Sequence, residues 1–430
     1  MKQDPKQGSR QIAEMVLAHV SSARLRVAIA ELAAYGGRED GGVARETLTG
    51  IDLQARRYLI DRARSIGCVV EVDDCANLFF RYAGRSDLPA VMTGSHVDTQ
   101  PVGGKLDGAY GVVAGLEVLQ ALHDAGVQPE RPIEVVVWTN EEGCRFGPGC
   151  MGSSAYVAPE RLVDYRAARD GDQLSFGEAV DRALQAIPDV PRRRMKQPLA
   201  GFVELHIEQG PVLEAAGTPL GVVTGIQSVR WYRVKVTGVA AHAGTTPMEH
   251  RTDAMAACMG MAQQLYAEAA CRQALGLRLT LGRWLVAPNS INTIPGEVEF
   301  TIDMRCVDEA VLAEFEAVLR DILQDRAGQT RVVLEPIFAR QPTHFPAEMT
   351  ALLEEACVRV CELAGKPAPL SLTSGAFHDA MYLADHCPTA MLFVPSKNGI
   401  SHNAAEETDH EDLFMGVQAL AYAVARMAGG

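Results

Sequence analysis

Apolar residues in the first half of the chain follow two spacings, one typical of helices and the other of strands. A helical period predicts helices, the first either continuous or broken into a pair, at residues 11–35, 52–65 and 109–123. Short apolar runs predict strands at residues 68–72, 77–82, 90–93, 133–139 and 202–207. This alternation predicts an α/β sandwich whose sheet is largely buried. The period is lost at residues 159–198, which we expect to form an irregular surface excursion.

The second half of the chain interrupts that pattern with a block of different order. A strand, a helix, two strands, a helix and a strand are predicted in turn at residues 230–238, 253–270, 277–286, 297–305, 309–326 and 331–338. This β-α-β-β-α-β order predicts a ferredoxin-like α+β domain, inserted at residues 228–339. The α/β pattern resumes with a helix, a strand and a helix at residues 349–364, 390–394 and 412–427. We therefore expect an outer domain made of residues 1–227 and 340–430.

The length and charge of the chain narrow the classes of partner. At 430 residues the chain is long for a single core, which supports two domains. Its formal net charge of -14 opposes binding to nucleic-acid phosphates or to an anionic membrane, since both attract basic surfaces. We find neither an apolar run of about 18 residues nor a signal-peptide pattern, so we expect no membrane span and a cytoplasmic location. The expected partner is a small molecule.

The cysteines favour a protein without disulfides. There are 10 of them, no two form a CxxC pair, and several lie inside apolar patterns, as Cys68, Cys258 and Cys357 do. Buried free thiols explain this distribution better than a disulfide framework or a cysteine zinc site. The ligands of any metal ion should therefore be histidines and carboxylates. The arginine triplet at residues 192–194 is expected to be solvated.

The glycine-rich segment at residues 93–111 follows a predicted strand, where α/β folds build their sites. His96 and Asp98 are one residue apart, so on an extended chain their side chains would face the same side and Asp98 could orient His96. Asp107 adds a second acid beside Gly108, where the backbone can turn tightly. Taken alone, however, this segment is better explained as a polar loop with a structural histidine.

Three other strand ends carry residues of the same types. Glu141 and Glu142 follow one apolar strand, and adjacent carboxylates diverge, so one could bind a metal ion while the other acts as a general base. His206 lies between acids on the polar face of a second strand, and His402 follows a third. Taken singly, these features also fit a charged strand cap, an exposed histidine and the start of a capped helix.

Considered together, these residues favour a metal centre. The candidate ligands offer nitrogen and oxygen donors that zinc, manganese, cobalt or nickel accept, and they are His96, Asp107, Glu142, His206 and His402. One shared carboxylate could hold two ions about 3.5 to 4 Å apart. The set resembles the dinuclear-metal aminoacylase and carboxypeptidase family, the M20-like metallohydrolases. Within that family, the chain resembles the branch of N-carbamoyl-L-amino-acid hydrolases, β-ureidopropionases and allantoate amidohydrolases, which have a histidine at the position of His206.

The resemblance implies two divalent metal ions per subunit, either zinc or one of manganese, cobalt and nickel. His96 and His206 would bind one ion, and Glu142 and His402 the other. Asp107 would bridge the two ions and would be followed by a cis peptide bond. The outer domain would be catalytic, and the inserted ferredoxin-like domain would act as a lid and as the dimerisation domain.

The resemblance also implies residues for catalysis and for substrate binding. Glu141 would be the general base, and Asp98 would hold His96. His242 would reach the active site of the partner subunit in a homodimer and stabilise the oxyanion. The substrate-binding residues would be Gln209, His242, Asn292, Arg305, Gly375 and His378. Arg305 would pair with a substrate carboxylate, although a surface charge is the alternative explanation for it.

The implied reaction is hydrolysis of the ureido C–N bond of an N-carbamoyl amino acid, giving the amino acid, carbon dioxide and ammonia. The substrate would be an N-carbamoyl-L-amino acid or N-carbamoyl-β-alanine. Allantoate amidohydrolase is the first alternative, and an aminopeptidase or dipeptidase on the same metal centre is the second. A metal-binding protein without activity is disfavoured, because it would not need the general base Glu141.

Overall fold

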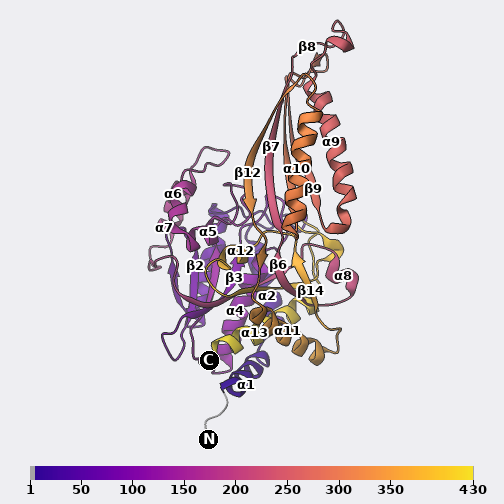
Figure 1. Cartoon of the computed structure of the whole chain (residues 1–430). Helices are drawn as coiled ribbons and strands as arrows, with labels where there is room; N and C mark the ends of the chain where they lie inside the picture. The colour runs from indigo at the N-terminus through magenta and orange to yellow at the C-terminus, as the bar shows by residue number, and fades with distance from the viewer. Residues whose placement is uncertain (1–4, 430) are drawn as a thin grey trace. The chain divides into compact units, whose positions relative to one another are not determined.

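The computed structural model of the chain describes residues 5–429 (Figure 1). The chain divides into two compact units, one made of Met1–Thr224 with Phe345–Gly430 and the other of Gly225–His344. We call them the sandwich unit and the inserted unit. No helix in the described part of the chain is both long and apolar enough to cross a membrane.

The sandwich unit is built on a mixed sheet. Its strands are β1 (Val69–Val72), β2 (Leu78–Tyr82), β3 (Ala90–His96), β4 (Ile133–Trp138), β5 (Leu199–Ile207), β6 (Gly221–Ile226), β13 (Thr343–His344), β14 (Leu370–Ser374) and β15 (Thr389–Val394). They lie in the order β1-β2-β4-β3-β5-β15-β6-β13, and β14 pairs with β6. The four central strands β4, β3, β5 and β15 are parallel to their neighbours within this group. Their carboxyl ends therefore meet at one edge of the sheet.

Helices cover the sheet as expected for an α/β sandwich. The helices of this unit are α1 (Pro5–Leu17), α2 (Ser22–Ala34), α3 (Gly50–Ser65), α4 (Ala109–Asp124), α5 (Met151–Val157), α6 (Leu162–Tyr165), α7 (Phe176–Ala186), α8 (Val212–Ala216), α11 (Ala347–Ala364), α12 (Ala380–Leu383) and α13 (His410–Ala428). Both α4 and α13 pack against β3 and β5. The predicted helix at residues 11–35 is a pair, with Ser21 capping α2.

Alternation along β5 separates the apolar core from the polar side of the sheet. Leu205 and Ile207 belong to the main hydrophobic core. Glu204 faces the opposite side, where it accepts hydrogen bonds from Ser95 Oγ at 2.7 Å and from the Ala380 amide at 2.9 Å. One strand thus packs the core with one set of residues and supplies polar groups with the other.

The predicted irregular segment at residues 159–198 contains the helices α6 and α7, so that prediction is wrong in part. Helix α7 begins at a capping box: the Glu178 amide donates to Ser175 Oγ at 3.2 Å, and the Glu178 carboxylate accepts from the Ser175 amide at 2.9 Å. The helix is short, and its apolar residues Phe176, Val180 and Ala183 are buried. The Ser-x-x-Glu pattern was the available sequence signal.

The arginine triplet is not uniformly solvated, which corrects a second prediction. The Val72 amide donates to the Pro191 carbonyl at 3.0 Å, and the Arg193 amide donates to the Val72 carbonyl at 2.9 Å. This contact fixes the segment along β1. As a result the Arg193 side chain is only 7% exposed, while Arg192 and Arg194 stay exposed.

The inserted unit has the predicted ferredoxin-like arrangement. Its elements are β7 (Ser228–Thr237), β8 (Ala241–His242), α9 (Ala254–Cys271), β9 (Arg278–Ala287), β10 (Thr293–Ile294), β11 (Glu297–Cys306), α10 (Glu309–Asp325) and β12 (Arg331–Arg340). Four strands form an antiparallel sheet in the order β12-β7-β11-β9. Helices α9 and α10 lie side by side on it (Figure 1). Residues of β11 alternate between buried and half-buried, which gives this sheet one core face.

Candidate metal centre

The candidate metal ligands lie at one edge of the sandwich sheet. His96 is the last residue of β3, and His206 is the second-last residue of β5. Glu142 follows β4, Asp107 precedes α4, and His402 lies in the loop after β15. These five residues, which we call the ligand cluster, come from four different strand ends. Parallel neighbours bring those ends together although the residues are far apart in the sequence.

The ligand cluster forms two groups that share one carboxylate. His96, Asp107 and His206 make one group, and Asp107, Glu142 and His402 make the other; within each group the donor atoms lie within 4.8 Å of one another. Asp107 Oδ1 is 3.2 Å from His206 Nε2, whereas Asp107 Oδ2 is 3.1 Å from His402 Nε2. The two oxygens of Asp107 therefore face different groups. Imidazole nitrogens with carboxylate oxygens, around one bridging acid, fit two divalent cations.

Burial and neighbouring charges shift the pKa values of the ligand cluster so that its shared carboxylate attracts positive charge. Burial opposes ionisation of Asp107, but hydrogen bonds from His206 and His402 hold its pKa well below the usual range. Burial alone would lower the pKa of His206, yet the hydrogen bond and charge of Asp107 raise it to about 9. Burial dominates at His96 and lowers its pKa to about 4. The shared carboxylate is thus the focus of attraction for cations.

The two adjacent glutamates diverge. The Glu142 carboxylate accepts from Gln100 Nε2 at 2.6 Å and lies 3.4 Å from His402 Nε2, whereas Glu141 Oε2 lies 3.4 Å from His96 Nε2. Burial, followed by the charge of Asp107, raises the pKa of Glu142 to about 8. Burial and then the nearby Asp379 raise the pKa of Glu141 well above its usual range. Glu141 is therefore a carboxylate with strong proton affinity beside the cluster.

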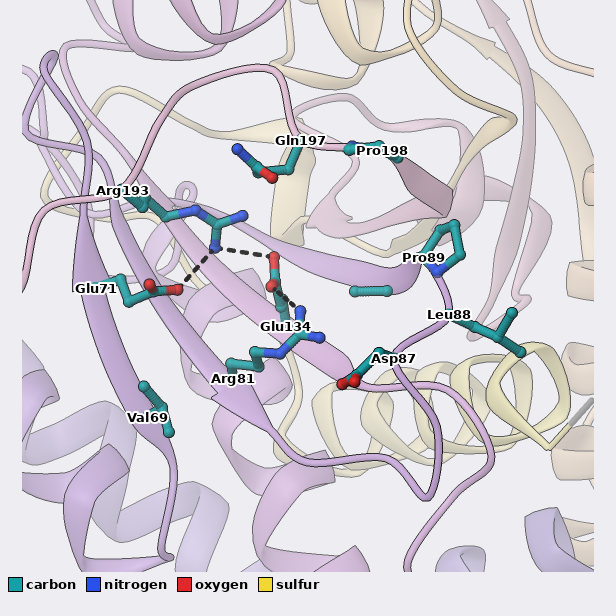
Figure 2. Close-up of a pocket in the computed structure, with 11 residues that line it drawn as sticks. Val69, Glu71, Arg81, Asp87, Leu88, Pro89, Glu134, Arg193, Gln197 and Pro198 are labelled. Carbon is teal, nitrogen blue, oxygen red and sulfur yellow. Dashed lines mark hydrogen bonds and ion pairs between the residues drawn. The ribbon is translucent and has the colours of Figure 1, made fainter.

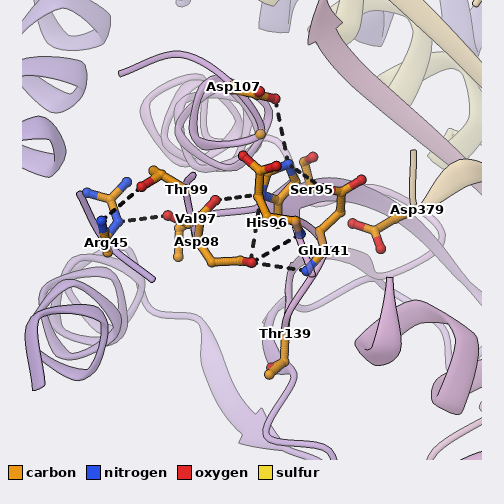
Figure 3. A network of polar contacts seen from close by, with 12 residues as sticks. Arg45, Ser95, His96, Val97, Asp98, Thr99, Asp107, Thr139, Glu141 and Asp379 are labelled. Carbon is orange, nitrogen blue, oxygen red and sulfur yellow. Dashed lines mark hydrogen bonds and ion pairs between the residues drawn. The ribbon is translucent and has the colours of Figure 1, made fainter. Parts of the chain in front are cut away.

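Asp98 makes a different contact from the expected one (Figure 3). The His96 ring bonds through Nδ1 to the backbone carbonyl of Asp98 at 2.9 Å, whereas the Asp98 carboxylate is 3.8 Å from that nitrogen. The carboxylate instead accepts from the amides of Glu141 at 3.3 Å and Glu142 at 3.2 Å. Since β3 ends at His96, Asp98 lies beyond the extended strand that the expected contact assumes. Asp98 thereby fixes the glutamate pair.

Gly108 makes the turn that follows Asp107. The bond between them is trans, where the resemblance predicts a cis bond; the cis bonds among the described residues precede Pro148 and Pro288. Gly108 instead has a φ of +62°, and a Cβ there would lie 2.3 Å from the imidazole of His96. Glycine is required at this position both for its backbone conformation and for the space that it leaves.

A second layer of residues supports Asp107, and the sequence did not single out its main member. Glu406 is buried and accepts from the amides of Leu106 at 2.8 Å and Asp107 at 3.1 Å, and from Ser401 Oγ at 2.8 Å. The predicted substrate residue Gln209 donates through Nε2 to Asp107 Oδ2 at 2.9 Å. An acid four residues after His402 was the only available signal for Glu406.

The loop after β14 brings His378 next to the cluster. Its ring packs edge-on against His206, with centroids 4.6 Å apart, and Nε2 is 2.9 Å from Ser374 Oγ. His378 is buried, and burial lowers its pKa well below the usual range. Gly375 lies half-buried in the same loop. His378 therefore contacts a candidate ligand, and its role in substrate binding stays a prediction.

The remaining predicted residues lie in the inserted unit, at two separate places. His242 and Thr293 are register partners on β8 and β10, and the Ala243 amide donates to the Asn292 carbonyl at 3.0 Å, so His242 and Asn292 are neighbours. Both are exposed. Arg305 is near the far end of β11, where it forms a two-pronged contact with Asp303 at 3.0 and 2.8 Å.

Comparisons with known proteins agree with this geometry. Residues 92–426 match Peptidase family M20/M25/M40. An N-carbamoyl-L-amino acid amidohydrolase of Geobacillus stearothermophilus is 37% identical, with 96% of this chain and 100% of that protein covered. Allantoate amidohydrolase of Escherichia coli (strain K12) is 35% identical, with coverage of 92% and 96%.

Solved structures give the same grouping. The crystal structure of an amidase of the hydantoinase/carbamoylase family from Burkholderia vietnamiensis is 40% identical, with a TM-score of 0.86 and coverage of 96% of this chain and 98% of that chain. Aminopeptidase PepT from Bacillus cereus shares the fold at 17% identity, with a TM-score of 0.62 and coverage of 95% and 100%. The chain therefore belongs to peptidase family M20/M25/M40 and groups there with the hydantoinase/carbamoylase amidases.

Proposed function

We propose that the protein hydrolyses the ureido C–N bond of an N-carbamoyl amino acid, releasing the amino acid, carbon dioxide and ammonia. The observation that carries the proposal is Glu141, whose side chain is 10% exposed and lies 3.4 Å from His96, beside two ligand groups that share Asp107. Relatives named as N-carbamoyl-L-amino acid amidohydrolases support the substrate class. The M20 family is metal-dependent, and the ligand cluster fits two divalent cations, with zinc as the proposed metal.

The residues of the site divide the chemistry between them. Cations held by the ligand cluster would supply positive charge that lowers the pKa of water and polarises the ureido carbonyl. Glu141 takes the proton from the attacking water and passes it to the leaving nitrogen. The Asp98 carboxylate holds Glu141 in place by accepting a hydrogen bond from the Glu141 amide at 3.3 Å. Gln209, which already donates to Asp107, is the proposed polar contact for substrate in the sandwich unit.

The inserted unit would act as the lid and as the dimerisation domain. His242 Nδ1 accepts from the amides of Gly244 at 3.0 Å and Thr245 at 3.2 Å, so in the neutral ring Nε2 carries the hydrogen. That N–H suits an oxyanion donor. The length of β11 separates His242 and Asn292 from Arg305, which suits two different active sites in a homodimer. Arg305 would bind the substrate carboxylate in competition with Asp303.

Substitution of Glu141 by Gln tests the proposed chemistry. The variant keeps its shape and its hydrogen-bonding capacity but cannot accept the proton, so we expect turnover to fall at least about 100-fold. Metal content, measured by mass spectrometry, and the melting temperature should stay close to those of the wild type. Near-normal activity would refute the assignment of the general base.

A panel of substrates tests the proposed specificity. N-carbamoyl-L-amino acids, N-carbamoyl-β-alanine, allantoate and Gly-Gly should be compared by their kcat/KM values. We expect N-carbamoyl amino acids to be the best substrates. Allantoate is the second candidate, because the relatives named as allantoate amidohydrolases are nearly as similar to the chain. Turnover of allantoate alone, or of the dipeptide alone, would contradict the proposal.

A further inference from the structure

A cavity of about 640 Å³ lies at the opposite edge of the sandwich sheet from the ligand cluster (Figure 2). Ala90, the first residue of β3, and Glu134, near the start of β4, line it, whereas His96 and Glu142 lie at or beyond the other ends of these strands. Its volume is within the range of small-molecule sites, about 300 to 1,000 Å³. The cavity is therefore separate from the candidate metal centre.

Its floor is a buried carboxylate between two arginines. The Glu134 side chain is 1% exposed; it accepts from Arg81 Nη1 at 2.7 Å and lies 3.2 Å from Arg193 Nη1. Arg81 and Glu134 are register partners on β2 and β4, so the sheet itself fixes this pair. The Arg193 guanidinium packs 4.1 Å from the centre of the Phe79 ring, which fixes its plane.

Both arginines retain hydrogen-bonding capacity. Within the described residues, the polar side-chain contacts of Arg81 and Arg193 involve only the Nη1 atom of each; Arg193 Nη1 also lies 3.5 Å from Glu71. A guanidinium has five N–H donors in a planar fork, and this fork matches a carboxylate. Figure 2 shows that the dashed contacts of each arginine leave from one terminal nitrogen and that the second terminal nitrogen carries none.

The balance of charge in the cavity selects the class of ligand. Three carboxylates, from Glu71, Asp87 and Glu134, face the two guanidinium groups of Arg81 and Arg193. A polyanion would meet this excess of negative charge, and a lone cation would leave the unused N–H donors of the arginines without an acceptor. A zwitterion satisfies both signs at once. Its apolar part would face the walls that Leu88, Pro89 and Pro198 form.

We propose that this cavity binds a free amino acid, with its carboxylate on Arg193 and Arg81 and its ammonium group toward Asp87 and Glu71. An amino acid is also the class of product of the proposed reaction. The proposal does not rest on that reaction, because the cavity shares none of the residues assigned to it.

Calorimetric titration of the full-length metal-loaded protein tests the recognition of both charges. L-leucine is the probe, N-acetyl-L-leucine removes the positive charge and L-leucinamide removes the carboxylate. We expect L-leucine to bind, and each analogue to bind at least about tenfold more weakly. Absence of L-leucine binding at millimolar concentration, or equal binding of the three compounds, would overturn the proposal.

Variants then place the binding site. Arg193→Gln removes the guanidinium fork. Leu88→Trp places a larger side chain in the cavity at a residue that is 41% exposed and that forms none of the ion pairs. Arg192→Gln is the matched control, because this neighbouring arginine pairs with Asp74 outside the cavity. We expect the first two variants to bind L-leucine at least about tenfold more weakly, and the control to bind it as the wild type does.

Stability and turnover separate this result from damage to the fold. The melting temperature of each variant is measured first, and if Arg193→Gln unfolds, Leu88→Trp alone decides. Turnover of the best substrate should be unchanged in Leu88→Trp, since the metal centre is at the other edge of the sheet. Wild-type affinity for L-leucine in folded Leu88→Trp would overturn the assignment, whatever the substrate panel shows.

Discussion

The ligand cluster and the predicted residues of the inserted unit differ in how completely the chain builds them. In the cluster, four strand ends converge, and His96, Asp107 and His206 are buried with their partners in place. In the inserted unit, His242 is exposed at one end of the sheet, and Arg305 contacts Asp303 at the other. One chain therefore organises the cluster by itself, whereas the roles proposed for the inserted unit rest on the proposed homodimer.

Replacement of Asp107 by Ala is the strongest test of the cluster as an organised site. Because Asp107 is shared by both ligand groups, we expect loss of metal and a fall in turnover of at least about 1,000-fold. Mass spectrometry would measure the metal content, and circular dichroism would check the fold. Asp172→Ala, at an exposed aspartate, is the matched control. A variant that kept its full metal content would contradict the claim that Asp107 organises the ligand cluster.

His242 provides the next largest effect and tests the need for a second chain. Loss of an oxyanion donor should lower turnover by about 100- to 1,000-fold in His242→Ala. Co-expression of His242→Ala with Glu141→Gln, on two differently tagged chains, should then restore activity in the purified heterodimer. In that heterodimer, one site combines an intact Glu141 with an intact partner histidine.

Heterodimers with no more activity than the two single variants would show that His242 acts within its own chain. The two regions would then belong to one site of a single chain, contrary to the comparison above.

Substitution of Gly108 by Ala tests the claim that close packing preorganises the ligand cluster. In Gly108→Ala, the new methyl group would lie 2.3 Å from the His96 ring, so the ring must shift and turnover should fall by about 100-fold. Gly126→Ala is the matched control, because Gly126 has a similar φ of +63° with no atom within 4 Å of an added Cβ. Equal losses in both variants would assign the effect to backbone strain alone.

Arg305 gives the smallest expected effect, on affinity. In Arg305→Lys a point charge replaces the fork, so KM should rise about tenfold while kcat stays close to the wild-type value. Arg278→Lys serves as the control, because Arg278 is the register partner of Arg305 on the neighbouring strand. A substrate panel in which KM does not respond to Arg305→Lys would remove Arg305 from the proposed binding site.

The sequence was sufficient for features that depend on local patterns. The apolar runs of β3, β4, β5 and β15 end close to their predicted positions, and the β-α-β-β-α-β order gives the inserted unit. Strand ends followed by histidines and acids pointed to the edge where the structure brings His96, Asp107, Glu142, His206 and His402 together. Periodicity and strand direction carry this information directly.

Sequence patterns could not predict contacts between residues that lie far apart in the chain. Burial of Arg193 depends on β1 and on Glu134, which no local pattern links to the arginine triplet. The contact of Asp98 depends on where β3 ends, which the apolar run predicts at Thr93 and the structure has at His96. Glu406 supports Asp107 through a contact between two loops that are 300 residues apart in the chain, and no local pattern predicts such a contact.

That link between Glu406 and the backbone at Leu106 and Asp107 has a consequence for synthesis on the ribosome. Asp107 emerges early, but His402 and Glu406 emerge only after the entire inserted unit has been translated. The inserted unit is continuous in sequence and can fold while the sandwich unit still lacks β15 and α13. The nascent chain therefore cannot assemble the second ligand group, and with it the proposed hydrolytic activity, until translation has passed Glu406.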